Sequence, residues 1–127
     1  MHNFIPKSLL HREIIKCKPM GKYLGNYKCH ANCLSYALRK GNVSKIIGVA
    51  QIFNDESCVT HFILLLIDGT YIDPTYGNLT NVMYSHNIII EEYEVDTFNP
   101  NRELNNLRNY IFNLLPWYHR LFHKNPY

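Results

Sequence analysis

Residues 45–67 read KIIGVAQIFNDESCVTHFILLLI and carry a clear strand pattern. Its two ends, Lys45 to Phe53 and Cys58 to Ile67, are rich in Ile, Val, Leu and Phe, and a short polar segment lies between them. This pattern is typical of two antiparallel strands joined by a turn. Residues 62–67 are apolar without interruption, so we expect both faces of the second strand to be covered and the strand to lie inside a sheet.

Further strands are expected downstream of this pair. Asp68-Gly69 predicts a tight turn into a short strand from Thr70 to Asp73. Pro74 ends that strand because proline cannot donate to a strand ladder. Residues 87–95 predict one more strand.

Two helices are predicted around the strands. From His30 to Lys40, apolar and small residues recur at helical spacing, and Gly41 supplies the stop. Residues 104–115 form an amphipathic helical pattern, which Pro116 breaks before a short aromatic helical turn. The expected class is therefore α+β, with an N-terminal cysteine-bearing helix packed on an antiparallel sheet and a C-terminal helix elsewhere on that sheet.

The chain's totals limit the function classes. A length of 127 residues with 46% hydrophobic and 18% charged residues predicts one domain over residues 1–127, frayed at 1–6 and 124–127. The net charge is +3, and the Lys and Arg residues are scattered and not clustered, which argues against nucleic-acid binding. The longest apolar run is far below the roughly 20 residues of a membrane span, and no signal-peptide pattern is present. We therefore expect a cytoplasmic protein with free thiols that binds neither nucleic acid nor membrane.

Cys29 is the candidate nucleophile. It stands at the start of the first predicted helix, where backbone N–H groups lack intrahelical partners and the helix dipole favours a thiolate. Such a position lowers the pKa of a cysteine. The same N–H groups can bind the oxyanion that forms when a thiolate attacks a carbonyl. Cys33, one turn later, is expected to fill the core, with a resolving or nucleophilic role as the alternatives.

His61 is the candidate base, and Asp73 is its candidate partner. An imidazole beside the thiol can take its proton and later protonate a leaving amine. A carboxylate can then fix the tautomer and orientation of the imidazole. Asn78 and Asn81 are the alternative partners, because an amide oxygen can serve in the same way.

The position of Asp73 poses a geometric condition. A two-residue turn at Asp68-Gly69 would pair Asp73 with Leu64, whose side chain leaves the strand on the face opposite to His61. The triad therefore requires a longer turn, a bulge, or a bend of the chain near Pro74.

These residues form an ordered pattern: Cys29-His30-Ala31-Asn32, then Gly48, Thr60-His61-Phe62 and Asp68-Gly69-Thr70-Tyr71-Ile72-Asp73-Pro74-Thr75. Over residues 27–77 the pattern resembles small bacterial and phage proteins with a Cys-His-x-Asn motif, and more distantly the transglutaminase-like and papain-like cysteine enzymes. The resemblance implies a papain/transglutaminase-like core and a Cys29, His61, Asp73 triad. It implies peptidase, glutamine deamidase or acyl transferase chemistry on a protein or peptide, without a cofactor. His30 and Asn32 belong to the motif, as support for the thiol and oxyanion or only as first-turn residues.

Two other classes of function stay open. Cys29, His30, Cys33 and His61 carry side chains that bind zinc, although a Cys-x3-Cys spacing on one helix is unlike common structural zinc sites. The same fold without turnover is also possible, as a binding module such as a phage or viral factor that acts on a host protein in the host cytoplasm.

Overall fold

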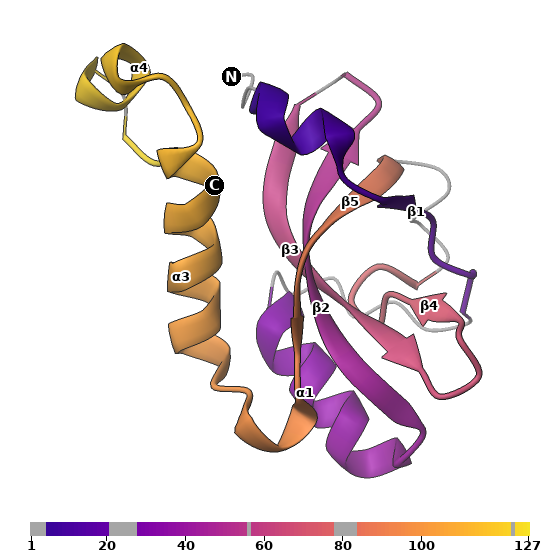
Figure 1. Cartoon of the computed structure of the whole chain (residues 1–127). Helices are drawn as coiled ribbons and strands as arrows, with labels where there is room; N and C mark the ends of the chain where they lie inside the picture. The colour runs from indigo at the N-terminus through magenta and orange to yellow at the C-terminus, as the bar shows by residue number, and fades with distance from the viewer. Residues whose placement is uncertain (1–4, 21–27, 56, 78–83, 123) are drawn as a thin grey trace.

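The computed structural model describes residues 5–20, 28–55, 57–77, 84–122 and 124–127 of the chain. The elements follow one another along the chain as η1 (Lys7–His11), β1 (Ile14–Ile15), α1 (Cys29–Lys40), β2 (Val43–Phe53), β3 (Cys58–Leu66), β4 (Tyr71–Ile72), β5 (Tyr84–Tyr93), η3 (Val95–Thr97), α3 (Pro100–Asn113) and α4 (Trp117–Phe122). The predicted α+β class is confirmed, with an antiparallel sheet packed against helices (Figure 1).

The sheet has five strands in the order β1-β5-β2-β3-β4, and all the pairs are antiparallel. The predicted hairpin of β2 and β3 is confirmed, since the two strands pair from Ile52 opposite Cys58 to Val43 opposite Leu66. The strand expected over residues 87–95 is β5, which begins three residues earlier. The two-residue strand β1 was not predicted, because Ile14–Ile15 is too short to show a period.

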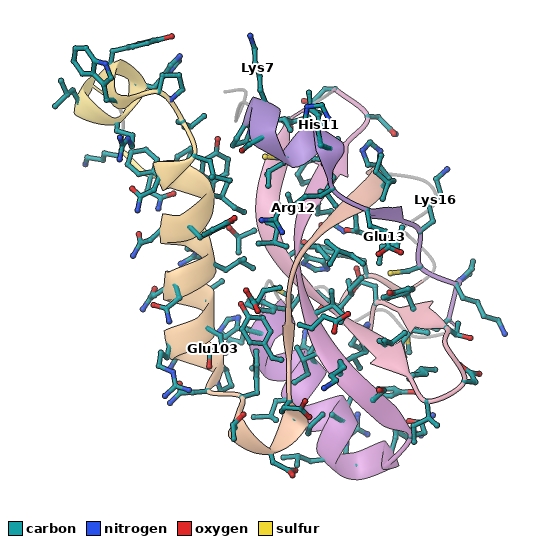
Figure 2. The ribbon with its side chains drawn as sticks, in the orientation of Figure 1. Lys7, His11, Arg12, Glu13, Lys16 and Glu103 are labelled. Atoms are coloured by element: carbon teal, nitrogen blue, oxygen red, sulfur yellow. The ribbon has the colours of Figure 1, made fainter. Side chains whose placement is uncertain are left out.

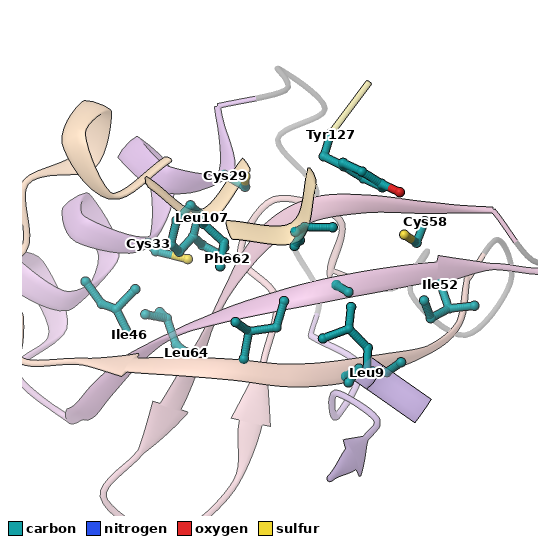
Figure 3. Packing of buried hydrophobic residues seen from close by; sticks show 14 of the residues in the cluster. Leu9, Cys29, Cys33, Ile46, Ile52, Cys58, Phe62, Leu64, Leu107 and Tyr127 are labelled. Atoms are coloured by element: carbon teal, nitrogen blue, oxygen red, sulfur yellow. The ribbon is translucent and has the colours of Figure 1, made fainter. Parts of the chain in front are cut away.

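Alternation along the central strands divides the sheet into two apolar faces. The face under α1 and α3 carries the larger cluster, with Ile46, Ala50, Phe62 and Leu64 from the strands. Cys33 of α1 and Leu107 and Ile111 of α3 pack onto that face (Figure 3). The opposite face carries a smaller cluster of Ile47, Val49 and Ile63, covered by Ile15 and Cys17 of the N-terminal segment.

Gly48 of β2 allows α3 to come close to the sheet. A Cβ atom at this position would lie 2.9 Å from Cδ2 of Leu107 and 3.1 Å from Cε2 of Tyr93. Any larger residue would therefore force the side chains of Leu107 and Tyr93 to move. The helix begins at Pro100, with the side chain of Asn99 accepting a hydrogen bond from the Arg102 N–H, which is a standard N-cap.

Arg12 joins the N-terminal segment to both β5 and α3. Its guanidinium donates to the carbonyl of Ile90 at 3.0 Å and to the hydroxyl of Tyr110 at 2.6 Å. Figure 2 shows Arg12 just below η1, with its side chain directed toward α3. The N-terminal segment is thus tied to both layers of the molecule.

Residues 124–127, which we expected to fray, make specific contacts with α3. Arg108 Nε donates to the Tyr127 carbonyl at 3.2 Å, and Asn125 Nδ2 donates to the Arg108 carbonyl at 3.2 Å. The Tyr127 side chain is buried, with 6% of its surface exposed.

Within the described residues, no helix combines the length and apolar character needed to cross a bilayer.

Candidate active site

Cys29 is the first residue of α1, as predicted. Lys28 is the N-cap residue, and its side chain makes no capping hydrogen bond. The first main-chain bond of the helix runs from the Asn32 N–H to the Lys28 carbonyl, so the N–H groups before it have no acceptor inside the helix. The thiol therefore lies at the positive end of a twelve-residue helix.

The turn after β3 decides on which face Asp73 lies. The Gly69 N–H donates to the Leu66 carbonyl, the Leu66 N–H donates to the Thr70 carbonyl, and Gly69 has φ +88°. This is a hairpin loop of three residues that ends in a left-handed glycine. β4 then pairs Ile72 with Leu64, one position away from the pairing of a two-residue turn. Asp73 follows on the same face as His61, so the longer turn meets the geometric condition.

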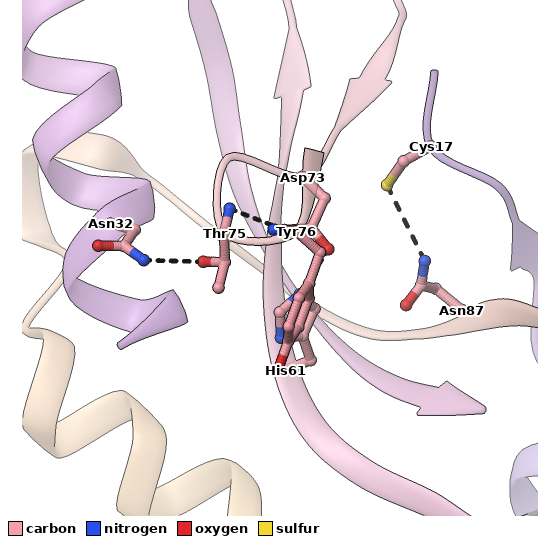
Figure 4. Close-up of polar contacts among 7 residues, drawn as sticks. All are labelled: Cys17, Asn32, His61, Asp73, Thr75, Tyr76 and Asn87. Carbon is pink, nitrogen blue, oxygen red and sulfur yellow. Dashed lines mark hydrogen bonds and ion pairs between the residues drawn. The ribbon is translucent and has the colours of Figure 1, made fainter. Parts of the chain in front are cut away.

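Asp73 holds His61 through a short hydrogen bond. His61 Nε2 and Asp73 Oδ2 are 2.7 Å apart, and the two side chains are almost fully buried (Figure 4). The other carboxylate oxygen, Oδ1, accepts from the N–H groups of Thr75 at 3.0 Å and Tyr76 at 3.1 Å. The carboxylate is thus satisfied on both sides, as a buried charge must be.

The loop that carries Asp73 is tied to α1 and to the imidazole. Asn32 Nδ2 donates to Thr75 Oγ1 at 2.9 Å, which joins the first turn of the helix to the loop (Figure 4). The Tyr76 ring lies 5.2 Å from the imidazole, between centroids, at an interplanar angle of 32°. Asn32 therefore positions the acid's loop, and Tyr76 covers one side of His61.

Cys29 and His61 meet at the edge of the sheet. β4 pairs only with Leu64 and Leu65, so among the described residues the first part of β3 has no strand on that side. Hydrogen bonding from the side chains of His30 and His61 and from the Phe62 N–H favours the thiolate form of Cys29 and so lowers its pKa. Since Asp73 occupies Nε2, Nδ1 is the ring nitrogen of His61 that is left for the sulfur.

The two partners shift each other's pKa in opposite directions. Burial raises the pKa of Cys29, but the positive charge of His61 and the three hydrogen bonds outweigh it and lower the value to about 6. Burial lowers the pKa of His61, but the negative charges of Asp73 and Cys29 and their hydrogen bonds raise it to about 10. The opposite shifts of the two pKa values favour a thiolate–imidazolium pair over a neutral one.

The other three cysteines are buried and keep their protons. Burial, together with the charges of Cys29, Asp73 and Cys17, raises the pKa of Cys33 well above its ordinary value. Burial followed by the charge of Asp73 raises the pKa of Cys17, and burial alone raises that of Cys58 to about 12. Cys33 packs in the larger core cluster, the place expected for core filler.

A cleft of about 250 Å³ opens beside the thiol and the imidazole. Its walls come from the first turn of α1, the hairpin end of β2 and β3, the loop after Asp73, α3 and the segment 124–127; the lining residues are Cys29, His30, Phe53, Val59, Thr60, His61, Tyr76, Leu104, Arg108 and Tyr127. Two buried polar atoms of these walls, His30 Nδ1 and Thr60 Oγ1, have no hydrogen-bond partner among the described residues. Buried polar atoms of this kind are usually satisfied by a ligand or by water.

The structure brings together the three predicted residues Cys29, His61 and Asp73, with His30 at the thiol and Asn32 one contact further away. The alternative partners Asn78 and Asn81 lie outside the described residues. The sequence analysis missed the contributions of Thr75 and of the α3 wall. An Asp-Pro-Thr turn was a usable signal for the first of these, since the N–H groups after an aspartate commonly bind its side chain.

For the zinc alternative, the described residues contain no group of three or more His, Cys, Asp or Glu side chains arranged to hold a metal ion.

Comparisons with known proteins identify no relative. No family model matches the chain, and neither the curated proteins nor the solved structures include a similar one.

Proposed function

We propose that this protein is a cysteine hydrolase or acyl transferase that acts on amide bonds, with Cys29 as nucleophile, His61 as acid and base, and Asp73 as the partner that holds His61. The observation that carries the proposal is the buried chain of contacts from a helix-start thiol through an imidazole to a carboxylate. Structural ion pairs also shift pKa values, but here the thiol in addition lines a cleft and stands at the start of a helix.

The first half of the reaction forms a thioester. The Cys29 sulfur attacks the carbonyl carbon, and the carbonyl electron pair moves to oxygen. The unpaired N–H groups of the first turn of α1 stabilise this oxyanion. His61 then gives its proton to the amide nitrogen as the carbon–nitrogen bond breaks, and the amine leaves.

The second half returns the enzyme to its starting state. Neutral His61 takes a proton from water or from an amine, which attacks the thioester carbon and expels the thiolate. Asp73 holds His61 through its hydrogen bond and stabilises the imidazolium each time that it forms. Water as the attacking group makes the protein a hydrolase, and an amine makes it a transferase. No cofactor takes part.

Three further features support the proposal. The orphaned polar atoms of His30 and Thr60 in the cleft wall suit the N–H and C=O groups of an amide substrate. The order and motif of the triad resemble transglutaminase-like and papain-like cysteine enzymes, and a papain-like core is part of the proposal. Asn32, which belongs to that motif, holds the loop of the proposed acid.

The test is the pH dependence of alkylation. Reduced protein is treated with iodoacetamide between pH 4 and 10, and the modified cysteine is located by peptide mass mapping. We expect Cys29 to react first, with a midpoint near pH 6, whereas Cys17, Cys33 and Cys58 stay unmodified in the folded protein. Labelling of Cys29 with the midpoint of an ordinary thiol, about 8.5, would remove the basis of the proposal.

A further inference from the structure

Tyr127, in the segment 124–127, lines the Cys29 cleft, although it lies almost a hundred residues away from Cys29 in the sequence. Tyr127 lies near the N-terminal end of α1, where a carbonyl group must come to reach the unpaired N–H groups (Figure 3). Its ring is buried near Cys58 of β3 and belongs to the larger core cluster. The space beside the thiol is therefore filled in part by the chain itself.

The contacts that hold this segment are of the kind that a bound peptide makes. Arg108 Nε donates to the main-chain carbonyl of Tyr127 at 3.2 Å. Asn125 Nδ2 donates to the carbonyl of Arg108 at 3.2 Å and to Asn109 Oδ1 at 3.3 Å. One aromatic side chain is buried, while Lys124 and Asn125 are exposed. A single anchor ring with hydrogen bonds at the main chain is a common mode of peptide recognition.

A second hollow lies against the same segment. It measures about 340 Å³ and is lined by Asn105, Arg108, Asn109, Asn125, Pro126 and Tyr127. Arg108 and Tyr127 belong to the walls of both hollows. If residues 124–127 moved away, the two hollows would join into one groove that runs from α3 to the thiol.

We propose that residues 124–127 occupy the substrate groove of Cys29, and that the groove takes an extended polypeptide segment with an aromatic side chain where Tyr127 now lies. This inference rests on the proposed function, whose substrate class it names. The substrate's main-chain carbonyl replaces that of Tyr127 at Arg108, and its amide bond lies between the aromatic subsite and the first turn of α1. Substrate and segment 124–127 exclude each other.

A tethered segment competes strongly with free peptides, because its effective concentration is on the order of millimolar. The full chain should therefore bind a peptide of residues 124–127 weakly, and a chain that lacks these residues should bind it well. This difference is measurable without any turnover.

The experiment measures binding of a fluorescent Lys-Asn-Pro-Tyr peptide by anisotropy. Both proteins carry Cys29→Ala, so that no covalent step takes place, and one of them ends after residue 123. We expect the shortened protein to bind the peptide about tenfold or more tightly than the full chain does. The peptide with Tyr127→Ala should bind about tenfold more weakly than the parent peptide. Equal binding to the two proteins, or equal binding of the two peptides, overturns the proposal.

A full-length variant covers the case in which the shortened chain does not fold. Tyr127→Ala should speed alkylation of Cys29 by a bulky maleimide relative to small iodoacetamide, because it opens the cleft. Tyr118→Ala is the matched control, since Tyr118 is exposed on α4 and does not line the cleft. An unchanged ratio of the two rates in Tyr127→Ala would contradict the proposal.

The two hypotheses fail in different ways. If Cys29 of the full chain titrates as an ordinary thiol but the shortened chain binds the peptide, the groove exists and the enzyme assignment is wrong. If Cys29 titrates near pH 6 and the peptide does not bind, the enzyme assignment stands and the substrate assignment is wrong.

Discussion

Cys29 and Cys33 lie one turn apart on the same face of α1, and both are buried, with 8% and 0% of their surfaces exposed. Burial raises the pKa of each thiol, and for Cys33 nothing opposes it. For Cys29, the charge of His61 and three hydrogen bonds reverse the direction. The degree of burial is nearly the same, so the difference in pKa direction comes from the position of Cys29 at the helix start and from the partners that surround it there.

The different environments of Cys29 and Cys33 lie close together along the chain. Cys29 is the first residue of the helix and reaches the edge of β3, where His61 and the Phe62 N–H face it. Cys33 is inside the helix and faces the apolar side of the same strand. Two cysteines only four residues apart thus lie in different surroundings, Cys29 at a polar sheet edge and Cys33 in the apolar core.

His61→Ala is expected to have the largest effect on the difference in pKa between Cys29 and Cys33. Without the imidazolium, burial dominates at Cys29 as it does at Cys33, and the pKa of Cys29 should rise from about 6 to 8.5 or more. Any amidase or transferase activity should fall by about 100-fold or more, because the variant lacks the imidazole of His61, the proposed general acid and base. The midpoint of alkylation measures the first effect. His86→Ala, in β5 outside the cleft, is the control and should leave the midpoint unchanged.

Asp73→Asn should have the next largest effect. It should change the alkaline end of the pH range over which His61 is an imidazolium. His61 has a raised pKa, so the imidazolium persists as the pH rises and is lost only through about pH 10. Removal of the carboxylate charge should move this loss toward pH 6.5, the ordinary value for histidine. In the wild type, the thiolate and the imidazolium coexist from about pH 6 to about pH 10. In Asp73→Asn, the upper limit of this pH range should be lower.

The same substitution has a consequence for stability. A raised folded-state pKa stabilises the protein fully below the unfolded-state value near 6.5, and this contribution disappears as the pH rises through about 10. Chemical denaturation of wild type and Asp73→Asn should therefore differ most near pH 6 and least near pH 10. Asp68→Asn is the control, since Asp68 lies in the exposed hairpin loop. Equal losses at both pH values would contradict a charge interaction between His61 and Asp73.

The sequence predicted much of this arrangement because its strongest signals are local. The apolar runs of β2 and β3, the helical spacing of α1 and the glycine at its end are each visible in short windows. The face of Asp73 was not predictable, because a three-residue and a two-residue loop after Leu66 differ by one position and place the side chain on opposite faces. The α3 wall of the cleft was not predictable either, since Arg108 and Tyr127 reach it only through tertiary packing.

A smaller effect is expected from the hydrogen bond that joins α1 to the loop that carries Asp73. Asn32→Ala removes the hydrogen bond to Thr75, and this should cost about 0.5–1.5 kcal/mol of unfolding free energy. Thr75→Val removes the other partner, and the double variant should lose less than the sum of the two single losses. Chemical denaturation measures all three. Strict additivity would show that the two side chains do not interact.

The smallest effect on the thiol is expected from Cys33→Ala. Cys33 is neutral at pH 7 and fills the core, so its removal should leave the midpoint of Cys29 alkylation near pH 6. The cavity should lower the unfolding free energy by about 1 kcal/mol. A large shift of the Cys29 midpoint in this variant would mean that the two cysteines share one environment, contrary to the comparison above.

The thiolate of Cys29 can be measured by the ultraviolet absorbance of the folded, reduced protein between pH 4 and 10, with Cys29→Ala as the reference. We expect one thiolate to form near pH 6 in the wild type and to be absent from Cys29→Ala. The same curve for the two proteins, with no thiolate formed below about pH 8, would show that Cys29 is an ordinary thiol.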